Sequence, residues 1–137
     1  MSYSIDLSGR VALVTGGGQA IGLACVDALS EAGARVIIAD YNPKVAEEAR
    51  YAMKARGRDV EMAIMDVTNS ARVDEVADDV VKRYGKIDIL VNNAGIARSE
   101  TPAETVTDEH WLNVIDVNLN GTFWCCRSFG RHMLAAK

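Results

Sequence analysis

The sequence predicts an α/β fold in which helices cover both faces of a doubly wound parallel sheet. Four short apolar runs alternate with segments whose apolar residues recur at helical spacing. Strands and helices that alternate in this way form right-handed βαβ crossovers, and therefore parallel sheets. A glycine-rich turn joins the first apolar run to the first helical segment. In such a turn, backbone N–H groups and the positive end of a helix can receive a phosphate.

The four apolar runs are predicted to be strands and cover residues 10–15, 35–40, 60–65 and 87–91. The first two are short and continuously apolar, as is typical of buried strands. Polar or small residues close each run. Ligands of open parallel sheets bind outside the carboxyl ends of the strands, so a site is expected at this edge.

Capping residues delimit the predicted helices. Asn42 with Pro43 begins the second helix, Asn69 or Ser70 the third and Thr107 the last. Gly33 suits the left-handed position after the first helix, and Gly57 and Gly85 end the second and third. The predicted ranges are 20–32, 43–56, 70–84 and 107 to the C-terminal end.

The last helical region carries a broad apolar stripe with one polar residue inside it. Asn118 lies within the stripe, and a polar residue there needs a bonding partner or a function. The aromatic content exceeds what one sheet face needs, which favours oligomerisation through this helix. The stripe consists of Trp111, Leu112, Ile115, Leu119, Phe123, Cys126, Phe129 and Met133.

Composition and charge narrow the possible partners. The 137 residues are 25% charged and 49% hydrophobic, with a formal net charge of −4. An acidic chain without a dense Lys/Arg run is a poor candidate for binding nucleic acid or an anionic membrane. The N-terminal residues lack a signal-peptide pattern, and three cysteines without metal-site spacing indicate reduced thiols. We therefore expect a cytoplasmic protein without a metal site or a membrane span.

The glycine-rich turn has the pattern Thr-Gly-x-x-x-(Gly/Ala)-x-Gly from Thr15 to Gly22. The commoner G-x-G-x-x-G pattern fails, because the sixth position from Gly16 is Ile21. Gly16 permits a tight turn, and Gly22 permits close packing of the helix on the sheet. Ala20 occupies the middle small position, where its methyl group is accommodated if φ is negative. A purely structural turn is the alternative for this stretch alone.

Acidic residues stand at the ends of the second and third predicted strands. Asp40 comes near the spacing at which an acid binds the ribose hydroxyls of a dinucleotide. Its charge repels a 2′-phosphate, which favours NAD over NADP. Asp66 could accept a hydrogen bond from an adenine amino group, and Val67 N–H could donate to a ring nitrogen. Each acid could instead be an ordinary solvated residue at a strand end.

The segment Asn92-Asn93-Ala94-Gly95 completes a set of motifs that resembles the short-chain dehydrogenase/reductase family across essentially the whole chain. The resemblance implies a Rossmann-type sheet with strand order 3-2-1-4 and strands 5–7 absent. It also implies a catalytic role for Asn118, whose main chain would hold a water in a proton relay. The implied cofactor-binding residues are Gly16, Gly18, Gln19, Ile21, Gly22, Asp40, Asp66, Val67, Asn93, Ala94 and Gly95.

The family's catalytic Ser and its Tyr-x-x-x-Lys motif have no match in this chain. None of the four tyrosines is followed by Lys four positions later. We therefore expect residues 1–137 to be the dinucleotide-binding, N-terminal part of a one-domain enzyme, inactive alone. The fourth strand would then be a bare apolar edge, which is a pairing hazard.

The resemblance implies NAD-dependent hydride transfer between a secondary alcohol and a ketone. The segments 95–98, 123–124 and 127–131 look like those of bacterial sugar-alcohol dehydrogenases of the family, which suggests a polyol as the small-molecule substrate. The alternatives are a 3-oxoacyl reductase and a non-catalytic NAD-binding module. Members of the family form tetramers or dimers, so a homotetramer or a dimer is expected of the full-length protein.

Overall fold

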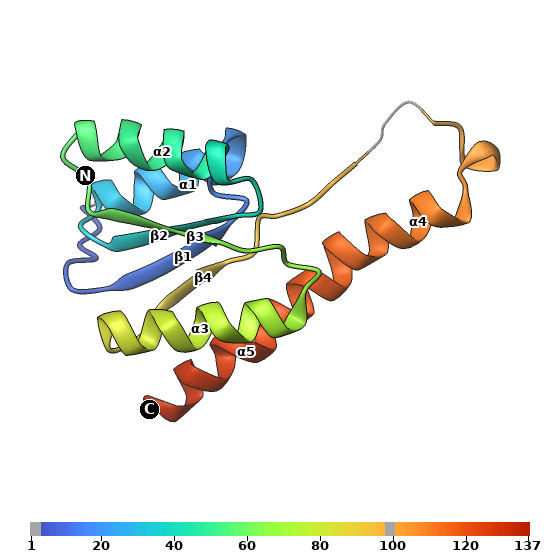
Figure 1. Ribbon diagram of the computed structural model, residues 1–137. Coiled ribbons are helices and arrows are strands. Elements are labelled where there is room, and N and C mark those ends of the chain that lie inside the picture. Colours follow the sequence, from blue (N-terminus) through green and yellow to red (C-terminus); the bar gives the residue numbers. More distant parts are fainter. Residues whose placement is uncertain (1–3, 98–100) are drawn as a thin grey trace.

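Four parallel strands form a single sheet in the computed structural model, which describes residues 4–97 and 101–137. The strand order is β3-β2-β1-β4, and every neighbouring pair is parallel. The predicted fold class and strand order are therefore confirmed (Figure 1). The strands are β1 (Val11–Thr15), β2 (Arg35–Asp40), β3 (Val60–Ile64) and β4 (Ile89–Val91).

Helices cover both faces of this sheet (Figure 1). α1 (Ala20–Glu31) and α2 (Pro43–Ala55) lie on one face, and α3 (Ser70–Tyr84) and α5 (Gly121–Ala135) lie on the other. α4 (Asp108–Ile115) extends away from the sheet. A 3₁₀ turn covers Ala103–Thr105, and a π-helical turn covers Asp116–Asn120. No helix in the described ranges is both long and apolar enough to cross a membrane.

The alternation of side chains along β1 builds two hydrophobic layers. Ala12 and Val14 are fully buried in the layer that α1 and α2 cover. Leu13 is fully buried in the other layer, together with Phe129 of α5. Because both faces of the sheet are covered, the strand is continuously apolar. This packing holds the carboxyl ends of the strands, where the loops emerge, in fixed positions.

Capping side chains begin three of the helices as predicted. Asn42 accepts hydrogen bonds from the N–H groups of Lys44 and Val45, at 3.1 and 3.3 Å. Asn69 caps α3 and Thr107 caps α4 in the same manner. α1 differs, because no side chain among the described residues caps its first turn. The N–H groups there need another partner, such as water or a ligand.

β4 begins later than the predicted range 87–91, because the Asp88 side chain replaces a backbone partner. Its carboxylate accepts from the Val11 N–H at 2.8 Å and pairs with Arg10 and Lys86. Burial alone would raise the pKa of Asp88. The Val11 N–H and the two cations together outweigh burial and hold that pKa below its usual value. The ladder between β1 and β4 therefore starts beyond this carboxylate.

The predicted apolar stripe is divided rather than continuous. Trp111, Leu112, Leu119 and Phe123 are 57–62% exposed. The buried face of α5 consists of Gly121, Cys125, Ser128 and Phe129. The physical reason is the π-helical turn, whose i→i+5 hydrogen bonding adds a residue to the turn and so rotates the helix that follows relative to the pattern of an unbroken α-helix.

The two neighbouring cysteines of α5 differ in exposure in the same way. Cys126, which the stripe included, is exposed. Cys125 is fully buried, and burial, with a smaller effect of Cys126, raises the pKa of its thiol to about 12. Cys125 is therefore a neutral packing residue.

Candidate functional site

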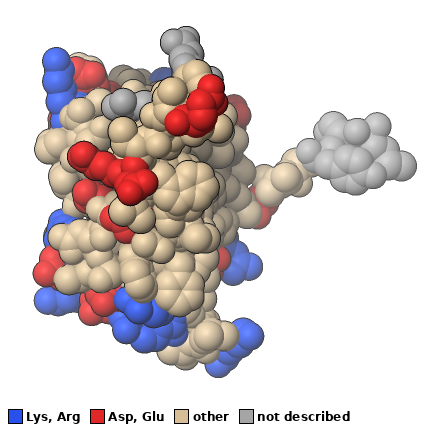
Figure 2. Space-filling view, turned by 90° about the vertical axis from the view of Figure 1, so that its right-hand side faces the viewer, with Lys and Arg blue, Asp and Glu red and all other residues tan. Residues whose placement is uncertain are grey.

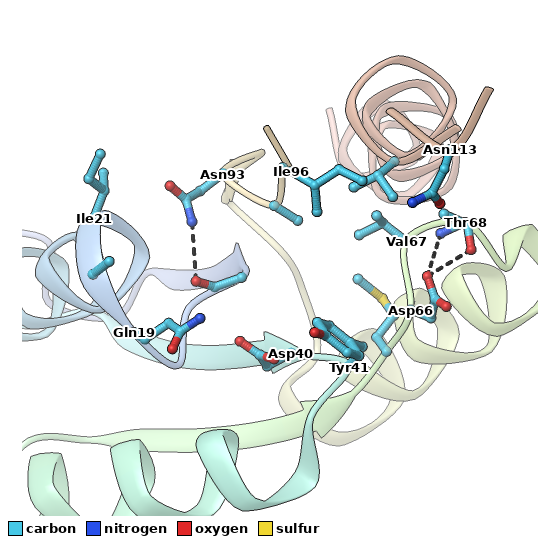
Figure 3. A pocket seen from close by; sticks show the side chains of 16 residues that line it. Gln19, Ile21, Asp40, Tyr41, Asp66, Val67, Thr68, Asn93, Ile96 and Asn113 are labelled. Carbon is cyan, nitrogen blue, oxygen red and sulfur yellow. Dashed lines mark hydrogen bonds between the residues drawn. The ribbon is translucent and has the colours of Figure 1, made fainter. Parts of the chain in front are cut away.

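A cavity of about 510 Å³ opens at the carboxyl ends of the strands. Its volume falls within the range typical of small-molecule sites. Figure 3 shows side chains from the turn after β1, the ends of β2 and β3, the segment after β4 and helix α4 around one space. The lining residues are Gly16, Gln19, Ala20, Ile21, Asp40, Tyr41, Met65, Asp66, Val67, Thr68, Asn93, Ala94, Gly95, Ile96, Asn113 and Val117.

Most of the predicted cofactor-binding residues line this cavity, and three of the predicted site residues do not. Gly18 and Gly22 lie in the turn and the first helical turn, where they allow close packing. Asn118 lies in the π-helical turn and contacts the segment after β4. The structure thus brings the motifs at the ends of all four strands to one edge, as predicted from the sequence.

The turn between β1 and α1 places the uncapped start of α1 at the cavity. Gly16 has φ of +60°, a left-handed conformation that suits glycine. A Cβ on Gly18 would lie 2.6 Å from the Val45 side chain and 2.9 Å from the Asp40 carboxylate. The N–H groups at the start of a helix attract anions.

Figure 2 shows the face of the molecule from which α4 extends. A largely uncharged surface runs down the middle of this face.

Ala20 does not meet the condition under which its methyl group is accommodated. That condition is a negative φ, whereas φ is +47°. Among the described residues it is the only non-glycine residue with positive φ. A left-handed conformation brings Cβ close to the following carbonyl oxygen, which costs about 1–2 kcal/mol. The turn therefore imposes a glycine-like conformation on an alanine.

We expect Ala20→Gly to raise the free energy of unfolding by about 0.5–1 kcal/mol, since relief of the strain exceeds the entropy cost of glycine. Urea unfolding with an unchanged m-value measures the gain. Ala24→Gly, at an exposed position within α1, is the matched control and should lose about 1 kcal/mol. Equal losses in the two variants would contradict the strain at Ala20.

Asn93 and Thr15 join the ends of β4 and β1. Asn93 Nδ2 donates to the carbonyl oxygens of Thr15 and Gly16, both at 3.1 Å. The Thr15 hydroxyl accepts from the N–H groups of Asn93 and Ala94, at 3.0 and 2.9 Å. Of the two predicted amides, only Asn93 joins the strand ends, whereas Asn92 Nδ2 lies 3.3 Å from Cys126 Sγ. The Thr15 hydroxyl is the centre of this network, a role that the sequence did not predict.

The Asp40 carboxylate links the turn after β1 to the end of β2. One oxygen accepts from the Gly18 N–H at 3.2 Å, and the other accepts from the Asn42 N–H at 3.1 Å. The residue is only 5% exposed, yet it lines the cavity. An ionised carboxylate has about four lone-pair positions, so it can accept further bonds. Asp40 can therefore hold the turn and a ligand hydroxyl at the same time.

The Asp66 carboxylate is held by the residue two positions further along. One oxygen accepts from both the N–H and the hydroxyl of Thr68, at 2.9 and 2.8 Å. In the described part of the chain, no donor is bonded to the other oxygen. This second oxygen, beside the apolar side chain of Val67, can accept a hydrogen bond from an amino group of a bound ligand.

Asn118 has a bonding partner that explains a polar residue in this helical region. Its Oδ1 accepts from the Ile96 N–H and its Nδ2 donates to the Ile96 carbonyl, both at 2.8 Å. The Thr122 hydroxyl donates to the Asn118 main-chain carbonyl at 3.0 Å. A π-helical turn of this kind is frequent at functional sites. Asn118 thus fixes the segment after β4 against the helix.

Seven lining residues were not among the predicted cofactor-binding residues: Ala20, Tyr41, Met65, Thr68, Ile96, Asn113 and Val117. Tyr41 directly follows Asp40, so its position after a strand end was the signal that could have identified it. Asn113 lies on α4, and no local pattern relates that helix to the cavity. Arg98, part of the segment compared with sugar-alcohol dehydrogenases, lies outside the described residues.

Comparisons with known proteins agree with this geometry. A sequence profile of the family described as short chain dehydrogenase matches residues 10–137. The galactitol 2-dehydrogenase of Rhizobium johnstonii is 50% identical over 139 residues, which cover 100% of this chain and 54% of that protein. The D-threitol dehydrogenase of Mycolicibacterium smegmatis is 39% identical, over 99% of this chain and 52% of that protein.

A solved structure is similar to this chain as well. The crystal structure of a gluconate 5-dehydrogenase from Burkholderia cenocepacia, in complex with NADP and tartrate, is 38% identical. It matches with a TM-score of 0.89, over 97% of this chain and 52% of that chain. This chain therefore spans about half the length of the curated relatives and of the solved structure that it matches.

Proposed function

The chain belongs to the short-chain dehydrogenase family, and from this premise we propose that it supplies the cofactor-binding half of an NAD-dependent oxidoreductase. In this proposal residues 1–137 are the dinucleotide-binding part of a one-domain enzyme. The whole protein transfers hydride between a secondary alcohol and a ketone. A bound nicotinamide cofactor supplies the hydride acceptor or donor for this chemistry.

One observation carries the proposal: the uncapped start of α1 and the Asp40 carboxylate line the same cavity. N–H groups at a helix start suit a pyrophosphate, and a strand-end carboxylate suits two ribose hydroxyls. The turn residues Gly16, Gly18, Gln19, Ile21 and Gly22 would hold the pyrophosphate. Asp66 and Val67 would hold the base, and Asn93 to Gly95 the nicotinamide half.

We propose NAD rather than NADP as the cofactor. The support is Asp40, whose negative charge repels a 2′-phosphate, while neither of the next two residues is basic. The gluconate 5-dehydrogenase structure contains NADP, so both cofactors occur among the relatives. The preference of this chain therefore depends on its own residues at the end of β2.

We propose a sugar alcohol as the substrate and Asn118 as the residue whose main-chain carbonyl holds a relay water. The names of the galactitol and threitol dehydrogenases support the substrate class. The hydroxyl of Thr122 occupies one side of that carbonyl oxygen, which leaves a second lone pair for a water. The three free cysteines fit a reducing compartment such as the cytoplasm.

Calorimetric titration with NAD and NADP, followed by an assay of NADH formation with galactitol and threitol, tests these proposals. The protein that carries this sequence should bind NAD more tightly than NADP and oxidise at least one polyol. Binding of NAD without turnover of any polyol or 3-oxoacyl substrate would favour a non-catalytic module. Failure to bind either cofactor would overturn the proposal.

We also propose that the full-length protein is a homotetramer or dimer that associates through α4 and α5. The support is the exposed apolar set Trp111, Leu112, Leu119 and Phe123, since burial of apolar surface drives association. Sedimentation velocity should show an oligomer that Trp111→Glu with Phe123→Glu dissociates. Tyr51→Glu, at an exposed position on α2, should leave it intact. A monomeric native protein would contradict this proposal.

A further inference from the structure

Gly121 is buried at the start of α5, where the backbone of the helix lies directly on the side chain of Val67. A Cβ on Gly121 would lie 2.6 Å from Val67 Cγ2 and 2.9 Å from Val67 Cβ. Carbon atoms pack at about 3.5–4.0 Å, so the two segments would have to separate by about 1 Å to admit a side chain. Val67 also lines the cavity, on the side that Asn113 of α4 lines (Figure 3). The start of α5 therefore rests on a wall of the candidate site.

The chain on either side of Gly121 is bonded to Asn118. The π-helical turn Asp116–Asn120 ends directly before Gly121 and includes Asn118. The hydroxyl of Thr122, the next residue, donates to the Asn118 main-chain carbonyl at 3.0 Å. The Asn118 side chain is bonded to both backbone groups of Ile96. A displacement of Gly121 would therefore be passed to the Asn118 carbonyl.

We propose that Gly121 is a positioning residue that couples the segment after β3 to the Asn118 carbonyl. The inference rests on the proposed function, in which Val67 contacts the base and the Asn118 carbonyl holds the relay water. Close-packed interiors transmit small displacements, and the helix contributes no flexible side chain to this contact. A ligand that fixes the segment after β3 should therefore also restrain the Asn118 turn. Binding of the adenosine half would then prepare the residue that acts at the other half.

Hydrogen exchange with and without saturating ADP-ribose, which lacks the nicotinamide, tests this coupling. In the native protein, ADP-ribose should slow exchange of the N–H groups of residues 118–122 by about 5- to 150-fold, the usual range of coupling between sites. Gly121→Ala should remove this protection. The double variant with Val67→Ala should recover part of it, because that change removes Cγ2, the atom nearest to the new Cβ. Gly130→Ala, where a Cβ meets no described atom within 4 Å, is the matched control and should keep the protection.

Steady-state kinetics with NAD and a polyol separate positioning from a merely structural role. Gly121→Ala should lower kcat and kcat/KM equally, by about 100-fold, because a displacement of about 1 Å near the reacting groups has an effect of this size. The double variant should recover part of kcat. A merely structural role would lower the free energy of unfolding in urea and leave the kcat of the folded protein unchanged.

The outcomes distinguish this inference from the proposed function. If ADP-ribose binds but does not protect residues 118–122 of the native protein, or protects them equally in Gly121→Ala, the coupling is overturned and the cofactor proposal stands. A double variant that recovers neither protection nor kcat would overturn the coupling as well. If Gly121→Ala does not fold, Val67→Ala alone decides, because it opens a gap beside Gly121 and should also remove the protection. Failure of the native protein to bind NAD or ADP-ribose would overturn both proposals.

Discussion

Gly22→Ala should abolish cofactor binding, with a loss in NAD affinity of at least about 100-fold, or about 2.7 kcal/mol. A Cβ at Gly22 would overlap the carbonyl oxygen of Gly16 and lie 2.5 Å from Asn93 Nδ2. Neither neighbour can move alone, because the Asn93 amide holds the carbonyls of Thr15 and Gly16. The turn must therefore shift away from the start of α1. That shift displaces the N–H groups that would receive the pyrophosphate.

The same substitution should lower the free energy of unfolding by about 1–3 kcal/mol, the usual cost of overpacking. Urea unfolding and calorimetric titration with NAD measure the two effects. Gly130→Ala is the matched control, because a Cβ there meets no described atom within 4 Å. It lies within α5, where alanine is favoured over glycine, so it should stabilise the protein slightly. Normal NAD binding by Gly22→Ala would contradict the prediction, because the turn would then accommodate a Cβ without displacing the N–H groups at the start of α1.

Much of the fold could be predicted because its signals are local. The runs at β1 and β2 are apolar on both faces, and a parallel sheet buries both. Asn42 and Gly85 each mark a helix end through bonds or dihedral angles within one turn of the helix. Such features depend only on neighbours in the sequence. The strand order, in contrast, followed from the family resemblance.

The features that sequence reasoning missed depend on contacts between distant residues. The π-helical turn includes Asn118, whose side chain is bonded to the Ile96 backbone. That contact cannot be read from helical periodicity, so the division of the apolar stripe was not predicted. The positive φ of Ala20 has a similar origin, because the turn is held by Asn93 and Asp40 rather than by its own residues. A negative φ, the condition for accommodating the methyl group, suits an isolated alanine, and this turn does not meet it.

In the candidate site, too, contacts between residues distant in the sequence could not be predicted. The strand-end positions of Asp40 and Asp66 could be predicted, because Asp40 ends one recognisable strand and Asp66 lies just beyond another. Asn113 could not, since α4 reaches the cavity only through the loop and the π-helical turn on either side of it. Reasoning from strand ends therefore finds the residues on the sheet and misses those that a distant helix contributes.

Asp40→Ser should reverse the preference between NAD and NADP. The carboxylate would make charged hydrogen bonds to ribose hydroxyls, and loss of such bonds costs about 1.5–3 kcal/mol, or about 10- to 150-fold in NAD affinity. Removal of its charge also removes the repulsion of a 2′-phosphate. Serine is too short to keep both bonds to the Gly18 and Asn42 N–H groups, so the turn should loosen for both cofactors.

Loosening of the turn should weaken the binding of NAD and NADP equally, so it cancels in the ratio of their association constants. This ratio therefore reports only the effect of Asp40 on ribose binding. We expect the NADP-to-NAD ratio of association constants to rise by about 100-fold, since the loss for NAD and the gain for NADP combine. Calorimetric titration of both cofactors measures this ratio. Asp59→Ser removes the same charge from an exposed pair with Arg35 away from the cavity, and it should leave the ratio unchanged. An equal loss for NAD and NADP in Asp40→Ser would mean that Asp40 acts only as a support for the Gly18 turn, and that cofactor preference is determined by other residues.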